Sequence, residues 1–415
     1  MDLLNTNHEF AQPRLTPRET FVASTLVHAV PHWYGAECGP YRHALHFAGG
    51  GAHPFYSISP LSSRLQGLLE FAGAKATEWA SAIPEFPSRL NEGRIGQDLA
   101  LFWLESHATE VNWSKVLAYL QEVSYRTYEG TQVSLNLIVK PGRGRVDLSA
   151  PGLQKVLDPL GSSDQVALVV DPELRYLDYV QIPWRDIPEQ EALHFHPDFV
   201  QPFFSLLQPG EFAAMVTNHG DILVVGTEGI LASERFGRWF VYDNESFRSV
   251  LSRASVGSWL PANLFQVVFD LSYRRRGALI LHDPDGSLED RVVNQEAFLE
   301  ASGAPADSVQ SLLAHKVSTI ELRSRRVERG ERRLLAEIAG VDGAVIVDDE
   351  RVRAFGAIVE PHPDAGGTGG ARETAALSAF LWGVSPVKIS SEGDITTYFK
   401  SRQGPQECDA QLTFM

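Results

Sequence analysis

The spacing of apolar residues predicts a helical N-terminal region. Thr16, Pro17 and Glu19 form the pattern of a capping box with proline at the first helical position. The apolar positions that follow lie on one face of a helix: Phe21, Val22, Leu26 and Val27. Two further segments, 59–73 and 112–130, have the same periodicity. We therefore expect at least three amphipathic helices before residue 130.

Alternating and continuous apolar runs predict strands in the middle of the chain. They cover 131–144, 164–173, 174–182 and the series 211–243. The clearest hairpin has the turn Asn-His-Gly-Asp at 218–221. From residue 244 onward, helical patterns (261–276, 319–340, 371–383) alternate with strand patterns (277–283, 343–349, 352–361, 386–390). This alternation is typical of an α/β fold.

These changes of pattern divide the chain into four parts. We expect an α+β region over 1–160, a β-rich, sensor-like region over 161–243, an α/β domain over 244–400 and a loose tail over 401–415. The α/β domain should have a mixed central sheet flanked by helices. A chain of 415 residues is long enough for two or three hydrophobic cores.

Composition narrows the class of protein. The formal net charge of −16 argues against broad binding to nucleic acid or to anionic membranes. The two cysteines, Cys38 and Cys408, lie far apart and suggest no disulfide framework. The first residues lack the pattern of a signal peptide, and no apolar run reaches about 18 residues. We therefore expect a cytoplasmic protein without a membrane span.

A glycine-rich segment precedes the last predicted helix. Gly366, Gly367, Gly369 and Gly370 leave the backbone bare, and Arg372 follows in the first turn. Free N–H groups and the helix dipole favour an anion at such a helix start, and arginine binds phosphate in a bidentate manner. The alternative is an ordinary surface loop before a helix.

A second polar feature is the sequence Asp342, Gly343, Ala344 at the start of a strand. The carboxylate of Asp342 could hold Mg²⁺ against a phosphate, and the two small residues would let a base or sugar approach the backbone. The alternative is a common Asp-Gly turn.

Taken together and in order, five segments resemble the diadenylate cyclase (DAC) domain family. The segments are RRRGALILHD at 274–283, VDGAVIVDD at 341–349, AFGAIVEP at 354–361, GARETAAL at 370–377 and ISSEGDIT at 389–396. The family joins two ATP molecules into cyclic di-AMP. The resemblance covers roughly residues 245–400, about a third of the chain or slightly more. It implies that Asp342 binds the catalytic metal, Mg²⁺ or Mn²⁺, and that Arg372 holds the triphosphate.

The departures from the family pattern lie beside the phosphate. Glu373 and Thr374 stand where the family has histidine and a second arginine, and Ser391 replaces a glutamate between Ser390 and Glu392. Losing one cation and gaining one anion should weaken ATP binding by about two orders of magnitude. A metal recruited by Glu373 would reduce this penalty.

The resemblance therefore predicts a nucleotide-binding protein, a degenerate DAC-like sensor with a partly lost catalytic motif. Asp342 and Arg372 are the expected catalytic residues, with nucleotide contacts from the following set: Gly343, Ala344, Gly370, Arg372, Glu373, Thr374, Ser390 and Glu392. The ligand would be ATP or a cyclic or other dinucleotide. We expect a homo-oligomer, because the family's reaction needs two domains face to face. An active diadenylate cyclase and a non-binding dimerisation scaffold remain the alternatives.

Other polar clusters have simpler explanations. His28 and His32 have a zinc-like spacing, but Pro31 interrupts the helix; His194 and His196 share a strand face but are too few for a ligand set. The basic segment 323–333 has the mixed charge of a solvated helix or hairpin, although it could flank a phosphate pocket.

Overall fold

The structure is a computed structural model of the 415-residue chain. It describes residues 15–30, 33–34, 41–46, 52–57, 61–84, 88–150, 152–153, 156–157, 166–183, 196–244, 262–299, 316–322, 329–366, 370–403 and 406–414.

The N-terminal region begins with four helices: α1 (Pro17–Ala29), α2 (Ser63–Ala82), α3 (Arg89–Glu105) and α4 (Trp113–Ser124). The capping box of α1 is confirmed, because Glu19 N–H donates to Thr16 Oγ1 (3.3 Å) and Thr16 N–H donates to the Glu19 carboxylate (2.8 Å). A small antiparallel sheet in the order β1-β3-β2 accompanies α1 and α2, with β1 at Trp33–Tyr34, β2 at Tyr41–His46 and β3 at Ala52–Ser57.

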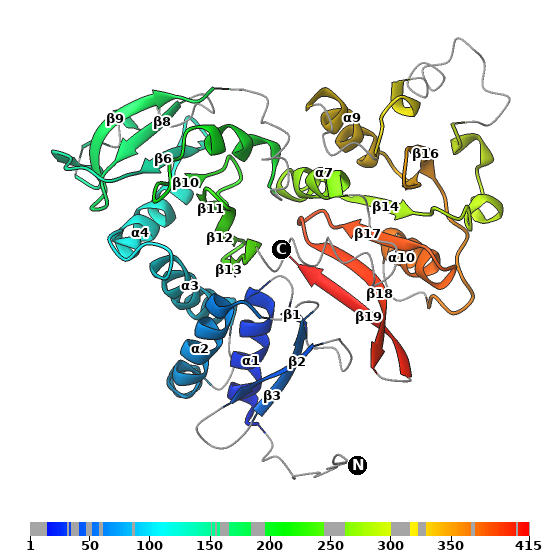
Figure 1. Cartoon of the computed structure of the whole chain (residues 1–415), viewed down its shortest axis with the longest axis horizontal. Helices are drawn as coiled ribbons and strands as arrows, with labels where there is room; N and C mark the ends of the chain where they lie inside the picture. Colours follow the sequence, from blue (N-terminus) through cyan, green and yellow to red (C-terminus); the bar gives the residue numbers. More distant parts are fainter. Residues whose placement is uncertain are drawn as a thin grey trace, which may run out of the picture.

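An eight-stranded sheet follows in the order β13-β12-β11-β10-β6-β8-β9-β7 (Figure 1). Its strands are β6 (Leu135–Val139), β7 (Val146–Asp147), β8 (Val166–Val170), β9 (Arg175–Gln181), β10 (Phe212–Val216), β11 (Ile222–Gly226), β12 (Gly229–Arg235) and β13 (Arg238–Val241). The predicted hairpin series is the antiparallel run β10 to β13. Helix α3 packs on β12 and β13, and α4 on β10 and β11. A short hairpin, β4 (Thr127–Tyr128) with β5 (Thr131–Gln132), precedes the sheet.

This sheet runs across the boundary that the sequence placed at residue 160. Strand β6 pairs with β10 in antiparallel and with β8 in parallel orientation, so it lies in the middle of the sheet. The first two predicted regions therefore share one sheet. Composition along the chain could not show this, because β6 reaches its neighbours through long-range pairing.

The C-terminal part has a six-stranded mixed sheet in the order β16-β15-β14-β17-β18-β19. The strands are β14 (Ala278–His282), β15 (Ala344–Val347), β16 (Val352–Ala357), β17 (Ser385–Ile389), β18 (Ile395–Gln403) and β19 (Gln406–Phe414). Strands β14 and β15 are parallel, and the other pairs are antiparallel. Helix α10 (Ala371–Leu381) shares a core with one face, whereas α7 (Ala262–Tyr273) and α9 (Arg329–Ala339) share a core with the other. The predicted α/β class is confirmed.

The expectation of a loose tail over 401–415 was wrong. Residues 406–414 form β19, which pairs with β18 from Ile395 opposite Phe414 to Gln403 opposite Gln406. Polar and apolar residues alternate along this segment with the period of a strand. Its polarity concealed that pattern.

The two large sheets share one hydrophobic interior. Helix α7 lies between them in Figure 1, and one buried cluster joins Met215 and Val225 of the eight-stranded sheet with α7 and Val387 of the other sheet. The 3-10 helices are η1 (Asp198–Ser205), η2 (Glu289–Arg291) and η3 (Gln295–Ala297). Within the described ranges, no helix combines the length and apolar character needed to cross a membrane.

Candidate functional site

The structure brings Asp342 and Arg372 together at one edge of the six-stranded sheet. Arg372 Nη2 lies 3.9 Å from Asp342 Oδ1. Asp342 is fully exposed in the turn before β15, whereas Arg372 in the first turn of α10 is about 39% exposed. An ion pair this long and this exposed contributes roughly 0–1 kcal/mol, so either partner can be exchanged for a ligand at little cost.

The backbone around Arg372 is bare. Its guanidinium lies so close to Gly277 that a Cβ there would approach Nη1 to 2.7 Å. Gly370 is the N-cap of α10 and makes no side-chain cap hydrogen bond. Arg372 Nε is buried and finds no hydrogen-bond partner among the described residues. The buried Nε is not accessible to a ligand, so the donors that remain for an anion are the first N–H groups of α10 and the exposed part of the Arg372 side chain. Residues 367–369 of the glycine-rich segment lie outside the described part of the chain.

Gly343 is required by the turn that carries Asp342. It has φ +101° and packs against the backbone of Gly356, itself at φ +67°, so a Cβ at residue 343 would overlap that backbone. Ala344 is only 1% exposed and belongs to the core that α10 shares with the sheet. Its methyl group therefore stabilises the core, and only its backbone could face a ligand.

Glu373 is turned toward internal partners. Its carboxylate accepts hydrogen bonds from Lys388 Nζ on β17 and from the Tyr398 hydroxyl on β18. Thr374 donates its N–H to Gly370 O (3.0 Å) within the helix and is half-buried. Because a lysine compensates the charge of Glu373, the repulsion expected from this carboxylate is reduced. The missing second cation is unaffected by this pairing.

Ser390 and Glu392 lie in the turn between β17 and β18. Ser390 Oγ accepts from Glu392 N–H (3.2 Å) and Asp394 N–H (3.0 Å), so the hydroxyl holds the turn. The Glu392 side chain is exposed. Burial raises the pKa of Asp394, and the nearby Glu392 raises it further. The turn also approaches Arg372, because a Cβ on Gly277 would lie 2.7 Å from Arg372 Nη1 and 3.6 Å from Ser391 N.

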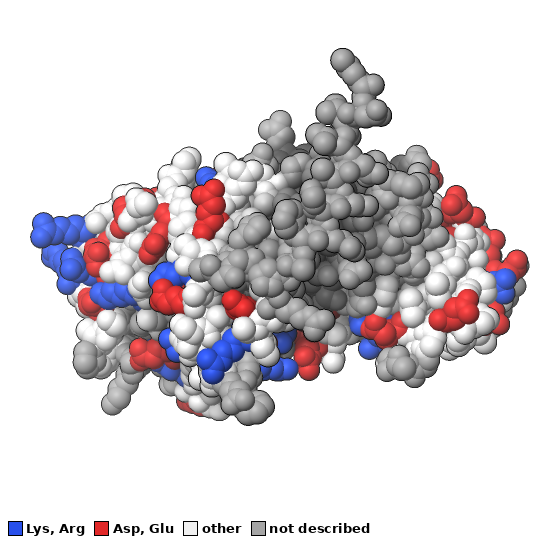
Figure 2. All heavy atoms as spheres, turned by 90° about the horizontal axis from the view of Figure 1, so that it is seen from below, with Lys and Arg blue, Asp and Glu red and all other residues white. Residues whose placement is uncertain are grey.

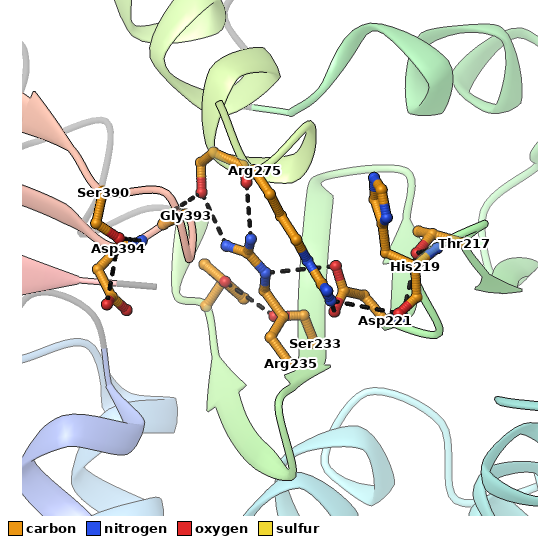
Figure 3. A network of polar contacts seen from close by, with 11 residues as sticks. Thr217, His219, Asp221, Ser233, Arg235, Arg275, Ser390, Gly393 and Asp394 are labelled. Carbon is orange, nitrogen blue, oxygen red and sulfur yellow. Dashed lines mark hydrogen bonds and ion pairs between the residues drawn. The ribbon is translucent and has the colours of Figure 1, made fainter. Parts of the chain in front are cut away.

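A buried polar network ties this turn to the eight-stranded sheet (Figure 3). Arg235 donates from Nη1 to Ser272 Oγ and from Nη2 to Ser272 O, both at 2.8 Å, and Ser272 Oγ donates to Gly393 O. On its other side, Arg235 Nε lies 3.6 Å from Asp221 Oδ2, while Arg275 donates to Asp221 Oδ1 at 2.8 Å. Gly393 has φ +92°, and a Cβ there would overlap Ser272 O and the Arg235 guanidinium. The two sheets are thus joined by charges as well as by the core.

Sequence reasoning missed several of these residues. Lys388 interrupts an apolar strand segment, which was the only local signal for it, and Tyr398 gave none. Burial lowers the pKa of Lys388, an effect that Asp394 opposes, and burial raises the pKa of Tyr398. No sequence pattern indicated Arg235 or Asp221, because the contact between them forms only in the folded protein.

The basic segment 323–333 also differs from expectation. Residues 323–328 lie outside the described ranges, but Arg332 on α9 is only 3% exposed rather than solvated. It binds Asp270 with two hydrogen bonds, from Nε at 2.6 Å and from Nη2 at 2.8 Å. This pair connects α9 to α7. Burial raises the pKa of Asp270, while Arg332 opposes the shift.

The histidines considered as metal ligands serve other roles where they can be examined. His28 Nδ1 lies 2.6 Å from Ser24 O, and His196 Nδ1 lies 3.0 Å from Pro197 O. His32 and His194 are outside the described residues. Among the residues that the structure does describe, no three metal-ligating side chains gather.

Comparisons with known proteins assign no family. No protein-family model matches the chain, and no curated protein matches it. Among solved structures, a hypothetical membrane spanning protein from Bacillus cereus is similar over 41% of this chain and 75% of its own, at 17% sequence identity and a TM-score of 0.25.

Proposed function

We propose that the C-terminal domain binds a nucleotide through Arg372 and Asp342 and acts as a degenerate DAC-like sensor. The observation that carries the proposal is the approach of Arg372 and Asp342 to 3.9 Å across two loops, beside a helix start without a side-chain cap. Arg372 and the N–H groups of α10 would hold phosphate oxygens.

Asp342 would hold Mg²⁺ or Mn²⁺ against the same phosphate. A fully exposed carboxylate suits this role, because Mg²⁺ keeps several waters and takes few protein ligands beside substrate phosphates. The metal would neutralise phosphate charge. The protein's own part is to place the carboxylate, through the Gly343 turn, opposite the arginine.

The contacts of Glu373 favour a nucleotide sensor over a catalytically active cyclase. Lys388 and Tyr398 hold the Glu373 carboxylate, so this side chain is committed to the fold. Thr374 cannot replace a second phosphate-binding cation. A site with one arginine and one metal can bind a nucleotide, but it has fewer charges to stabilise a transferring phosphoryl group.

The experiment that decides is incubation of the full chain with ATP and Mg²⁺ or Mn²⁺, followed by chromatography of the nucleotides and by thermal-shift measurements. We expect thermal stabilisation by ATP without a cyclic product. Arg372→Ala should abolish the stabilisation, and Asp342→Asn should remove its dependence on the metal.

Matched variants separate the site from general charge effects. Asp364→Asn changes another exposed aspartate of the same domain, one that lies 3.7 Å from His362 and should leave binding unchanged. A cyclic dinucleotide that appears with the wild type and disappears with Asp342→Asn would replace the sensor by an active cyclase. Absence of both product and stabilisation would favour the dimerisation scaffold.

A further inference from the structure

A cavity of about 790 Å³ lies between the eight-stranded sheet and the C-terminal domain, and its lining includes neither Asp342 nor Arg372. Ser134, Asn136 and Met215 line it from the sheet side, and Tyr273, Arg274 and Arg333 from α7 and α9. Clefts of roughly 300–1,000 Å³ with a few placed polar groups are the usual size for small-molecule sites.

The deep wall of this cavity is aromatic and apolar. Phe203, Met215 and Tyr273 are 1–3% exposed, so they form a fixed, buried surface. Phe199 meets Tyr273 edge to face, with ring centroids 5.9 Å apart. A flat ring would bury apolar area here and make offset or edge contacts with these side chains.

The rim is cationic. Arg274 and Arg333 are both exposed, and Arg274 Nη1 is only weakly held, 3.6 Å from Glu337 Oε1. Asp270 also lines the cavity, but the two hydrogen bonds from Arg332 neutralise its charge. Asp198 is the other acidic lining residue, so the lining has two arginines and two aspartates, and the formal charge becomes +1 only when Arg332, which binds Asp270, is counted with them. Burial, and then Arg275, lowers the pKa of His219 at the rim, which leaves its ring neutral at pH 7.

We propose that this cavity is a binding site for a small aromatic anion, with its ring against Phe199 and Tyr273 and its acidic group at Arg274 and Arg333. The arrangement, an apolar bottom with a few cations at the mouth, matches an amphipathic ligand of that class. The proposal stands independently of nucleotide binding at Arg372.

The site has a physical connection to the rest of the molecule. Its lining includes residues 217–219 of the turn 217–221, in which Thr217 Oγ1 accepts from the N–H groups of His219 and Asp221. Figure 3 shows Thr217, His219 and Asp221 of this turn, and Asp221 pairs with Arg235 and Arg275. A ligand that orders the turn therefore acts on the network that ends at Gly393, next to Ser390.

The test uses two fluorescent probes of similar shape, the anion 8-anilino-1-naphthalenesulfonate and the neutral N-phenyl-1-naphthylamine, titrated into the folded full-length chain. We expect saturable binding of the anion with one site per chain. The double variant Arg274→Ala/Arg333→Ala, which changes two exposed side chains, should weaken the anion about tenfold and leave the neutral probe unchanged.

Two more variants complete the design. Ser134→Phe fills the cavity and should weaken both probes by about tenfold or more. Arg145→Ala, an exposed arginine outside the lining, should change neither. Three outcomes would overturn the proposal. The first is binding of the anion that does not saturate, the second is binding at more than one site per chain, and the third is an affinity for the anion that is the same in the wild type, the double arginine variant and Ser134→Phe. Equal loss of both probes in the double variant would overturn the role of the arginines.

Discussion

Two clusters of charge in this chain differ in almost every physical respect. In the buried polar network of Figure 3, Asp221 and Arg235 are 1–2% exposed and contact Arg275, Ser272 and Gly393. At the candidate site, Asp342 is fully exposed and meets Arg372 only at 3.9 Å. The first cluster is buried and held by several hydrogen bonds, whereas the second is a single long and exposed ion pair.

The difference shows which charges stabilise the fold and which are available to bind a ligand. Buried ions must be paired, since an unpaired one costs several kcal/mol, so the network around Arg235 is committed to joining the two sheets. The exposed pair contributes little to folding and can turn to a ligand. On the face shown in Figure 2, both acidic and basic side chains lie on the surface of the described parts.

The largest effect should come from removing Asp221. Asp221→Ala leaves Arg235 and the partly buried Arg275 without their carboxylate, and we expect a loss of about 3–5 kcal/mol in the free energy of unfolding. Urea denaturation of the full chain measures it. A loss below about 1 kcal/mol would mean that the network does not hold the sheets together.

A pH dependence should follow from Glu234, the neighbour of Arg235 on β12. Burial, and then the charge of Asp221, raises the pKa of Glu234 from 4.5 to about 7. The folded state thus binds the proton more tightly than the unfolded state, so stability falls as pH rises from about 4.5 to about 7 and then stays level.

Glu234→Gln isolates this contribution. The variant should match the wild type near pH 4.5 and exceed it by about 3 kcal/mol at pH 8, since each pKa unit is worth about 1.36 kcal/mol. The measured quantity is the difference in unfolding free energy between the two proteins at each pH. A difference that is constant with pH would contradict the raised pKa.

Substitution of Glu373 should have an intermediate effect on the free energy of unfolding, because its side chain is less buried than that of Asp221 and more buried than that of Asp342. Its side chain is 30% exposed and that of its partner Lys388 is 17% exposed. Glu373→Ala leaves the lysine and the Tyr398 hydroxyl without an acceptor, and should cost about 1–2 kcal/mol. Glu373→Gln, which keeps an acceptor, should cost less. Equal losses for the two variants would show that the acceptor is unimportant.

The smallest effect on folding is expected at the candidate site itself. Asp342→Asn should change the unfolding free energy by less than about 0.5 kcal/mol, because its ion pair is long and exposed. The same variant should nevertheless remove the metal dependence of nucleotide binding. A loss of stability as large as that of Asp221→Ala would erase the distinction between the two clusters.

Much of the local structure follows from short-range sequence patterns. The capping box at Thr16, the hairpin series from β10 to β13 and the strand-helix alternation after residue 244 follow from patterns within a few residues, because hydrogen bonding and side-chain periodicity act at short range. The sequence also pointed to Asp342, which directly precedes Gly343, and to Arg372, which lies two positions after Gly370.

The partners of the buried charges, by contrast, depend on the tertiary fold. It turned Glu373 toward Lys388 and Tyr398, buried Arg332 on Asp270, placed β6 at the centre of a sheet that crosses residue 160, and made residues 406–414 a strand. The partners of the buried charges and of β6 lie between 15 and 81 positions apart in the chain, whereas β19 pairs with β18, the strand that precedes it in sequence. Local patterns do not specify the long-range contacts among these, because burial and charge pairing depend on which residues the completed fold brings together.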